Sequence, residues 1–487
     1  MSYQVPQHID PNKVFLINHS ELEGRLDSMF YTRQFSDIIV ALKKCFLYKR
    51  LGQVALFSSE SWNQKDYYET VFPYIDIGAI NITDGKIDDV SFVPVEQAPS
   101  RAKVIVRTGD IIISTTRPDR GAIIKITENE NLYIASTGFS VIRNIDSNIN
   151  PDYLLAILRH KLILLQMRQR STGGNYPAIT QEELSKIIIP IPPVDIQNKI
   201  VSLIESAHTK KQEADFVANS LVQSIDGYLL NELGIQLPET KSQTIQDRMF
   251  VVNFCEVSGG RFDSKLYSNA IKQLKQSLFT SPYKKQPLNY FIKSSCSGEW
   301  GKDETEEVDE SKNTKCLVIR ATEFDNTYNL QLDNSRVKYR WIDNSKLSRM
   351  EILPNDLLIE KSGGSEDQPV GRISILTEDI LQAHQIAYSN FIHKMTVEGI
   401  NPMYLYFYLK TMHNIGITDS MQSQTNGIRN LIMKEYYDQI IVVPPLQKQQ
   451  EIVDHISSIR QQAKALQEEG KAILEQAKKE VEQMILG

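Results

Sequence analysis

The longest regular pattern in the chain is a series of small and apolar residues spaced three or four positions apart, found in 191–232 and again in 443–487. The mean spacing is close to the ~3.5 residues of helices that pair along an apolar seam. A single exposed seam is not stable alone, so we expect the two helices to pack on each other. The predicted pairing residues are Ile200, Ile204, Ala207, Ala214, Leu221 and Ile225 in the first helix, and Ile452, Ile456, Ile459, Ala463, Leu466 and Ile473 in the second.

Two residues interrupt this seam, Lys211 in the first segment and Gly470 in the second. Glycine inside a helix costs about 1 kcal/mol relative to alanine, but it lets two helix backbones approach closely. Pro193 and Pro445 precede the two segments, at a position where the first turn of a helix tolerates proline. A linker at 233–247 connects the first helix to the rest of the chain, so the second helix should return antiparallel to the first.

The remainder of the chain contains short β-branched runs separated by turn residues. Examples are 103–107, 110–114 and 122–126, which glycine and proline residues separate. A helical stretch at 151–159 follows them, and 402–410 is similar to it. This mixture of strand and helix patterns predicts α+β domains.

The chain also contains an internal repeat. Arg25-Leu-Asp-Ser-x-x-Tyr31 recurs as Arg261-Phe-Asp-Ser-x-x-Tyr267 at an offset of 236 residues, Gly109-Asp-Ile-Ile112 matches Asn355-Asp-Leu-Leu358 at 246, and Pro192-Pro-x-x-x-Gln197 matches Pro444-Pro-x-x-x-Gln449 at 252. The order is kept while the offset grows, which indicates insertions in the loops of the second copy.

Together these patterns divide the chain into five segments. The first globular domain spans 1–190, the first long helix 191–232, the linker 233–247, the second globular domain 248–442 and the second long helix 443–487. The predicted fold class is α+β: two similar globular α/β domains separated by two long antiparallel coiled-coil helices, related by a pseudo-twofold internal repeat.

Composition narrows the class of protein. With 54 Lys and Arg against 60 Asp and Glu, the net charge is −6, which disfavours a surface that binds nucleic acid everywhere and leaves local basic patches as the alternative. The four cysteines form no CxxC pair, so neither a zinc knuckle nor a disulfide framework is supported. The N-terminus is polar, and no apolar run reaches the ~18 residues of a membrane helix. We therefore expect a cytoplasmic protein that does not bind a membrane.

Motifs of common catalytic sites are absent from the sequence: there is no GxxxxGK[ST] loop, no GxGxxG turn and no HExxH. Asp356 and Glu360 suggest a nuclease metal site, but Ser114 occupies the second position in the other copy, which favours a plain strand after a turn. Ile191-Pro-Pro-Val194 and Val443-Pro-Pro-Leu446 are similar to the [DNS]PP[YF] turn of adenine methyltransferases. Apolar residues replace both the polar acceptor and the stacking aromatic. We expect neither a catalytic nor a metal site on this chain.

The repeated motifs have a characteristic order. In the first copy Ser171-Thr-Gly-Gly-Asn175 precedes Ile187-Ile-Ile-Pro-Ile-Pro-Pro193 and Gln197-x-x-Ile200-Val201; in the second, Ser423-Gln-Thr-Asn-Gly427 precedes Ile440-Ile-Val-Val-Pro-Pro445 and Gln449-x-x-Ile452-Val453. With the strand-turn segment 353–363, this order resembles the specificity subunit of type I restriction–modification systems, over nearly the whole chain.

The resemblance implies that each globular domain is a target-recognition domain, which reads one half of a bipartite site in double-stranded DNA, and that the helices set the gap. It implies that the chain catalyses nothing and carries no cofactor. Two separate methyltransferase subunits would bring S-adenosylmethionine, and separate restriction subunits, where present, would bring ATP and Mg²⁺. Antiparallel helices would present the domains in opposite orientations, on opposite strands.

Arginine and amide side chains in turns can read the edges of DNA bases, whereas Lys, Arg and Ser bind the phosphate backbone and so position the protein on the DNA. On this basis the candidate DNA-binding residues are Arg117, Arg120, Arg168, Arg170, Ser171, Asn175 and Tyr176 in the first domain, and Lys361, Ser362, Arg372, Asn426 and Arg429 in the second. Each also fits a solvated surface charge or a turn residue.

Three alternatives stay open at the level of sequence. One is a stand-alone DNA-modifying enzyme, which the missing motifs disfavour. Another is a coiled-coil scaffold for protein partners that does not bind DNA. The third is a specificity protein of another DNA-modification or phage-defence system, in which only the partners differ.

Overall fold

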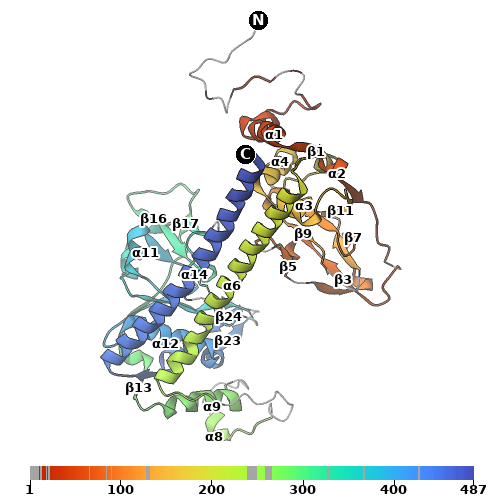
Figure 1. The fold of residues 1–487 in the computed structure, drawn as a ribbon. Coiled ribbons are helices and arrows are strands. Elements are labelled where there is room, and N and C mark those ends of the chain that lie inside the picture. Colours follow the sequence, from red (N-terminus) through yellow and green to blue (C-terminus); the bar gives the residue numbers. More distant parts are fainter. Residues whose placement is uncertain are drawn as a thin grey trace. The chain divides into compact units, whose positions relative to one another are not determined.

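The computed structural model describes residues 10–486 except 11–13, 18, 20–21, 65, 84, 89, 128–131, 239–248, 258–265, 326–327, 329, 335, 366–367 and 426–427. Asn426, most of the predicted linker 233–247 and most of the repeat motif 261–267 therefore lie outside the described residues. The chain forms two compact units (Figure 1): the first comprises Met1–Asp215 with Gln467–Gly487, and the second comprises Phe216–Leu466.

The first unit contains two four-stranded sheets. One has the order β2-β11-β8-β9 with antiparallel neighbours, and the other has the order β6-β3-β10-β7, in which β3 and β10 run parallel. The strands are β1 (Leu47–Arg50), β2 (Ala55–Ser58), β3 (Val71–Ile75), β4 (Ile80–Asn81), β5 (Lys86–Ile87), β6 (Ser91–Pro94), β7 (Ala102–Val106), β8 (Ile111–Ser114), β9 (Ile123–Lys125), β10 (Tyr133–Ser136), β11 (Phe139–Ile145) and β12 (Ile188–Ile191). The helices are η2 (Ser28–Tyr31), α1 (Arg33–Cys45), α2 (Leu51–Val54), η3 (Ile77–Ala79), η4 (Val95–Gln97), η5 (Pro118–Arg120), α3 (Pro151–Leu158), α4 (Lys161–Arg170) and α5 (Gln181–Ser185).

The second unit repeats this plan. Its sheet β14-β22-β18-β20 is antiparallel, and its sheet β15-β17-β16-β21 again contains one parallel pair, β16 and β21. The strands are β13 (Lys284–Pro287), β14 (Ile292–Ser297), β15 (Lys302–Asp303), β16 (Asn313–Ile319), β17 (Lys338–Asp343), β18 (Leu357–Glu360), β19 (Ser362–Gly364), β20 (Ile373–Ile375), β21 (Ile386–Tyr388), β22 (Ile392–Val397), β23 (Gln422–Thr425), β24 (Ile428–Leu431) and β25 (Ile440–Val443). The helices are α8 (Phe254–Val257), α9 (Asn269–Ser277), η6 (Leu278–Thr280), η7 (Leu288–Phe291), η8 (Ala321–Glu323), α10 (Asn344–Met350), α11 (Glu378–Ala383), α12 (Pro402–Asn414), η9 (Ile417–Met421) and α13 (Met433–Tyr437).

The continuous apolar runs form strands that are covered on both faces. In β8, Ile111 and Ile113 belong to one buried cluster and Ile112 to another. In β18, Leu357 and Leu358 are divided between two clusters in the same way. Because successive side chains of a strand point to opposite faces, a strand buried on both faces has an apolar residue at every position. The β-branched runs of the sequence thus become strands, as predicted, and β8 lies in the interior of its sheet.

The Pro-Pro motif and its glutamine form the same joint in both units. The Oε1 of Gln197, which is fully buried, accepts from the backbone N–H of Asn150 at 2.9 Å, and its Nε2 donates to the carbonyl of the first proline at 2.9 Å. Gln449 makes the equivalent bonds to Asn401 at 2.9 Å and to its own proline at 2.8 Å. Asn150 and Asn401 are the N-caps of α3 and α12. The motif is therefore a structural joint at the start of each long helix.

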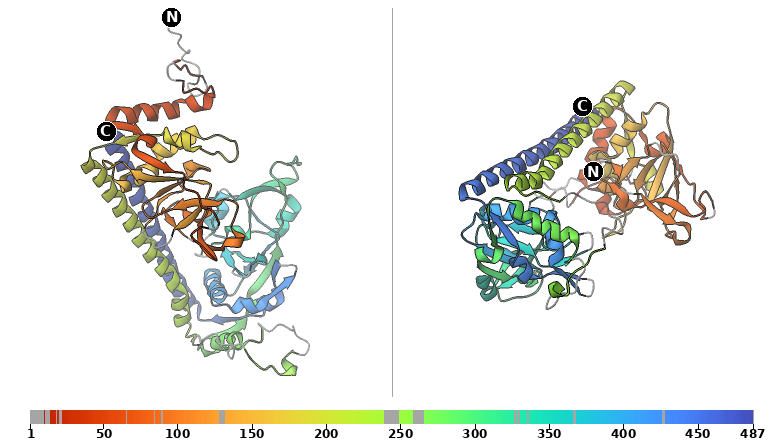
Figure 2. Two further views of the ribbon diagram at one scale, coloured as in Figure 1. Left: turned by 90° about the vertical axis from the view of Figure 1, so that its right-hand side faces the viewer. Right: turned by 90° about the horizontal axis from the view of Figure 1, so that it is seen from below.

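The two long helices are α6 (Val194–Glu232) and α14 (Leu446–Leu486). They run side by side within each unit (Figure 1, Figure 2). In the first unit Ala207 packs with Leu474 and Ala477, and in the second unit Ile225 belongs to the same cluster as Ile452. Early residues of α6 thus meet late residues of α14 and the reverse, so the helices are antiparallel, as predicted.

The structure places the pairing residues at different depths. Seven are buried, namely Ile200, Ala207, Ile225, Ile452, Ile456, Ile459 and Ala463. Ile204, Ala214, Leu221, Leu466 and Ile473 are only partly buried. Leu474, not Ile473, takes the buried position after Gly470, because the step from Gly470 is four residues and not three. Ile473 is partly buried and packs against the cluster of Ala207, Leu474 and Ala477, so it also takes part in the pairing of the helices.

Lys211 and Gly470, the two interruptions of the seam, face each other in the first unit. A Cβ on Gly470 would lie 3.3 Å from the Cα of Lys211 and 3.4 Å from the Cβ of Ala214. Lys211 is 7% exposed, and its Nζ pairs with Asp215 at 2.6 Å. The missing side chain of Gly470 therefore makes room for the aliphatic part of a buried lysine.

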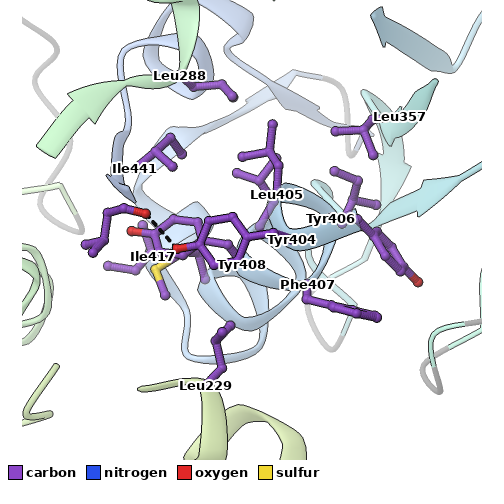
Figure 3. Close-up of a cluster of buried hydrophobic side chains, with 14 of the residues drawn as sticks. Leu229, Leu288, Leu357, Tyr404, Leu405, Tyr406, Phe407, Tyr408, Ile417 and Ile441 are labelled. Atoms are coloured by element: carbon purple, nitrogen blue, oxygen red, sulfur yellow. Dashed lines mark hydrogen bonds between the residues drawn. The ribbon is translucent and has the colours of Figure 1, made fainter. Parts of the chain in front are cut away.

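The core of the second unit is built around α12, which is buried on all sides. Figure 3 shows Tyr404, Tyr406, Phe407 and Tyr408 of this helix packed between strands and Leu229 of α6. The hydroxyl of Tyr404 donates to the carbonyl of residue 442 at 2.6 Å, and that of Tyr408 to the carbonyl of residue 440 at 2.9 Å. Each aromatic ring is thus buried without leaving its polar atom unpaired. Among the described residues, no helix is both long and apolar enough to span a bilayer.

Candidate functional site

Two loops of the first unit lie together where β8 and α4 end. One is 115–121 and the other is 171–178, and together they are called the first loop pair. A β-bridge joins Thr116 to Ala178, and the backbone N–H of Arg117 donates to the carbonyl of Pro177 at 2.7 Å. Helix α4 also packs against η5, which lies within the first of these loops. The two candidate segments that are separate in the sequence therefore form one surface.

The partly buried Arg117 and the exposed Tyr176 join the two loops through their side chains. Arg117 has a left-handed backbone conformation with φ 48°, which turns its side chain across the second loop. Its Nη2 donates to the carbonyl of Asn175 at 2.7 Å, and its guanidinium lies 4.4 Å from the ring centroid of Tyr176. Tyr176 is 71% exposed. The ring and carbonyl hold the guanidinium in place while its other N–H groups remain available to a ligand.

The remaining candidates of the first unit differ in accessibility. Arg120, Arg168 and Asn175 are exposed. Ser171 is partly buried, and its hydroxyl donates to the carbonyl of Met167 at 2.7 Å, which completes the last turn of α4.

Arg170 lies in the interior, contrary to what a DNA contact requires. It is 3% exposed, and its two terminal nitrogens pair with Glu23 and Glu183, each at 2.9 Å. A guanidinium paired with two carboxylates inside the domain has little to offer a phosphate or a base. We therefore withdraw Arg170 as a DNA contact.

The second unit has an equivalent pair of segments, 361–364 on one side and 422–425 with 428–431 on the other, which are called the second loop pair. Strands β19, β24 and β23 join them into a small sheet. Lys361 and Arg429 are partly exposed there. Ser362 is 5% exposed and donates to the side chain of Asn430 at 2.7 Å, so its hydroxyl serves the sheet and we withdraw it as a DNA contact.

Arg372 is also buried and is withdrawn for the same reason. Its Nε and Nη2 donate to Glu360 at 2.8 and 2.9 Å, and it also donates to the carbonyls of Phe324 and Ala321. This accounts for Glu360, which suggested a nuclease site in the sequence. Its carboxylate is the partner of a buried arginine.

The aspartate of the Gly-Asp-Ile turn has the same structural role in both copies. Asp110 pairs with Arg143 at 2.7 Å, and Asp356 pairs with Lys394 at 3.1 Å. Arg143 donates hydrogen bonds to Asp110 and to Glu60, and these bonds raise the pKa of its guanidinium above the ordinary value. No group of three or more potential metal ligands occurs among the residues that the structure describes. The carboxylates near these strands are thus used in ion pairs.

Sequence reasoning missed the residues that contact the end of α4, directly before the second loop of the first loop pair. Glu23 and Phe30 contact the end of α4, where Gln169 donates to the carbonyl of Phe30 at 2.7 Å. The signal was present, because these residues lie within and beside the first repeat motif, Arg25 to Tyr31, to which no role was assigned.

One acidic segment lies away from both loop pairs in the sequence. Six of the eight residues in 303–310 are Asp or Glu, and this segment, which connects β15 to β16, is almost wholly exposed. One loop of the second domain therefore holds as many acidic residues as the whole net charge of −6. The net charge of the whole chain therefore does not report the local charge of either loop pair.

The fold and the loop pairs define a class of protein: two similar α+β domains on one chain, each followed by a long helix, with the two helices antiparallel. The family model for the type I restriction modification DNA specificity domain matches 48–215 and 300–476, one match in each copy. The chain belongs to this family, which confirms the resemblance found in its motifs.

Individual relatives are distant. The chain is 25% identical over 203 residues to the Type I restriction enzyme HindI specificity subunit of Haemophilus influenzae, and the match covers 41% of this chain and 43% of that protein. The matched part thus spans less than half of that relative.

Solved structures similar to the chain include a chain from a study of complex assembly and conformational transition of the type I R-M system, with 20% identity, a TM-score of 0.48 and coverage of 91% of this chain and 97% of that chain. The HsdS subunit from Thermoanaerobacter tengcongensis has 20% identity, a TM-score of 0.36 and coverage of 91% and 96%. The type I restriction-modification S subunit from M. genitalium has 12% identity, a TM-score of 0.40 and coverage of 90% and 96%.

Proposed function

We propose that each loop pair reads one half of a bipartite site in double-stranded DNA. The observation that carries this proposal is the Arg117–Tyr176 arrangement at 4.4 Å, on a loop surface whose counterpart in the second copy presents Lys361 and Arg429. A fixed guanidinium suits a guanine edge or a phosphate, because its donors lie in one plane. The two loop pairs differ in sequence, so the two half-sites should differ.

The long helices set the unread gap between the half-sites in this proposal. Helix α6 has 39 residues and so extends about 58 Å at ~1.5 Å per residue. With ~3.4 Å per base pair along a strand, a spacer of this kind implies a gap of several base pairs. Antiparallel helices also favour reading of opposite strands.

The partners in this proposal are methyltransferase subunits, two of them because the fold is duplicated. They would supply S-adenosylmethionine and the methyl transfer, and restriction subunits, where the system has them, would supply ATP-driven translocation with Mg²⁺. Membership of the family supports this division of labour.

The test is a methylome of cells that express the chain with its methyltransferase subunits. Arg117→Ala should relax or abolish recognition of one half-site and leave the other unchanged, with a loss of about 5- to 150-fold for one bidentate base contact. Arg101→Ala is the matched control, because Arg101 is an exposed arginine of the same unit outside the loop pair. Unchanged half-sites with Arg117→Ala would contradict the proposal, and methylation without any sequence preference would favour a scaffold.

A further inference from the structure

The first repeat motif, Arg25 to Tyr31, closes on itself as a compact segment. Arg25 pairs with the carboxylate of Asp27 through two hydrogen bonds of 2.6 and 2.8 Å. The hydroxyl of Tyr31 donates to the carbonyl of Arg25 at 2.8 Å and accepts from the backbone N–H of Glu23 at 3.0 Å. Of the four residues that the repeat retains, Arg25, Asp27 and Tyr31 make the hydrogen bonds that shape this segment.

The same segment is fastened to the end of α4. Phe30 is 3% exposed and lies under two guanidiniums, with Arg25 at 4.3 Å and Arg170 at 5.3 Å from its ring centroid. Gln169 donates to the carbonyl of Phe30 at 2.7 Å, and Arg170 reaches Glu23 at 2.9 Å. A charge-assisted bond, a backbone bond and a buried ring thus fix the last two residues of the helix.

The second loop of the first loop pair starts at the very next residue, Ser171. Its far end is fixed independently, because the N–H of Ile179 donates to the carbonyl of Thr115 at 2.9 Å. The start of the loop is held in two ways: Thr172 and Ala178 exchange two backbone hydrogen bonds of 2.8 Å, and Arg170, with what it binds, anchors the residue before Ser171. Asn175 and Tyr176, which hold Arg117, lie four and five residues beyond that start.

We propose that Glu23–Tyr31 is a clamp that positions the first loop pair for reading its half-site, with Glu23 and Arg170 as positioning residues that do not contact DNA. This inference rests on the proposed function of the loop pair. Glu183 keeps Arg170 paired when Glu23 is removed, so loss of the clamp loosens one end of the loop and leaves the helix folded. Sequence discrimination should suffer more than stability.

The test uses the full chain with its methyltransferase subunits and a plasmid library in which each half-site carries single substitutions. Glu23→Gln removes the negative charge that faces Arg170 and keeps the size of the side chain. Glu96→Gln is the matched control, because Glu96 is an exposed glutamate of the same unit. Arg25→Ala is a second clamp variant, since Arg25 contacts Asp27 and Phe30 and shapes the clamp.

Both clamp variants should raise methylation at sites with a mismatched first half-site by roughly fivefold relative to matched sites, the equivalent of about 1 kcal/mol for a part-exposed ion pair. Discrimination at the other half-site should not change, and it serves as an internal control for the amount of folded protein. The first half-site is the one that Arg117→Ala alters.

The outcomes separate the two proposals. If Arg117→Ala alters one half-site and neither clamp variant does, the clamp is wrong and the proposed function stands. Equal losses at both half-sites, together with a lower melting temperature, would mean that the segment only stabilises the fold, and would overturn the clamp. If Arg117→Ala alters neither half-site, the loop pair does not read DNA and both proposals fail.

Discussion

The duplicated joint at the start of the long helices allows a quantitative test of the repeat. Gln449 is 1% exposed and makes one bond to Asn401 and one to the carbonyl of Pro444. Leucine at this position has a similar volume but cannot donate or accept. Gln449→Leu would therefore leave a buried N–H and a buried carbonyl without partners.

The expected cost follows from those two groups. Each buried polar group that loses its partner costs about 1–3 kcal/mol, so Gln449→Leu should lower the free energy of unfolding by roughly 2–6 kcal/mol. Gln197→Leu should cost at least as much, because the amide of Gln197 also donates to the carbonyl of Asn148 at 3.2 Å. Gln447→Leu, an exposed change on the first turn of α14, should stay within about 0.5 kcal/mol.

Amide hydrogen exchange of the full chain, followed by mass spectrometry, measures each joint separately. Gln449→Leu should speed exchange in the peptide around Asn401, and Gln197→Leu should do so around Asn150. A cost below about 1 kcal/mol in either variant would show that water replaces the lost bonds, and would refute the view that the joint is a closed, buried connection.

Two further results are expected. Burial, helped by the nearby cations Lys410 and Arg372, lowers the pKa of His413 from 6.5 to about 4. Between those two pH values the unfolded chain binds a proton that the folded chain does not. The free energy of unfolding therefore falls as the pH drops through this window, by up to about 3 kcal/mol. His413→Asn should flatten the decline of the urea midpoint between pH 7 and 4.5, and an unchanged decline would contradict the lowered pKa. Gly470→Leu should lower the free energy of unfolding by about 1–3 kcal/mol, because the larger side chain overpacks against Lys211. Thermal melts followed by the circular dichroism signal of helices measure this effect, and a stabilised variant would disprove the close approach of the two helices.

The fold could be predicted from the sequence because its main signals are periodic and local. The 3–4 spacing identified both long helices, and the apolar runs identified strands that are buried on two faces. Repetition added the pseudo-symmetry, which one copy alone would not reveal. Even the two flaws of the seam, Lys211 and Gly470, were informative, because the structure places them opposite each other. The spacing could not separate Ile473 from Leu474, because two adjacent apolar residues fit it equally well; Leu474 is buried and Ile473 packs beside it.

The candidate site could be predicted only in part. The neighbouring sequence of an arginine is similar whether its side chain faces solvent or pairs with a buried carboxylate. Arg170 has two carboxylate partners, Glu183 at 13 positions and Glu23 at 147 positions, and no local rule connects it to the distant one. Arg372 pairs with Glu360 where the antiparallel strands β18 and β20 meet, which the strand pattern allowed but did not require. Arg117 differs in that its neighbours leave it accessible, and that distinction depends on how two remote loops meet.

The repeat extends beyond its sequence motifs to the docking of each domain on a long helix, and there it preserves position but not chemistry. In the first unit His160 lies 3.1 Å from the carbonyl of Lys478, and in the second unit Thr411 donates to the carboxylate of Asp226 at 2.6 Å. Lys478 is the counterpart of Asp226 at the same offset of 252 residues that relates the two Pro-Pro motifs. A backbone acceptor in one unit thus corresponds to a side-chain acceptor in the other. Because the bond types differ, the two copies have diverged at the contacts between each domain and its long helix. The joint formed by glutamine and proline at the start of both helices has kept the same bonds in both copies.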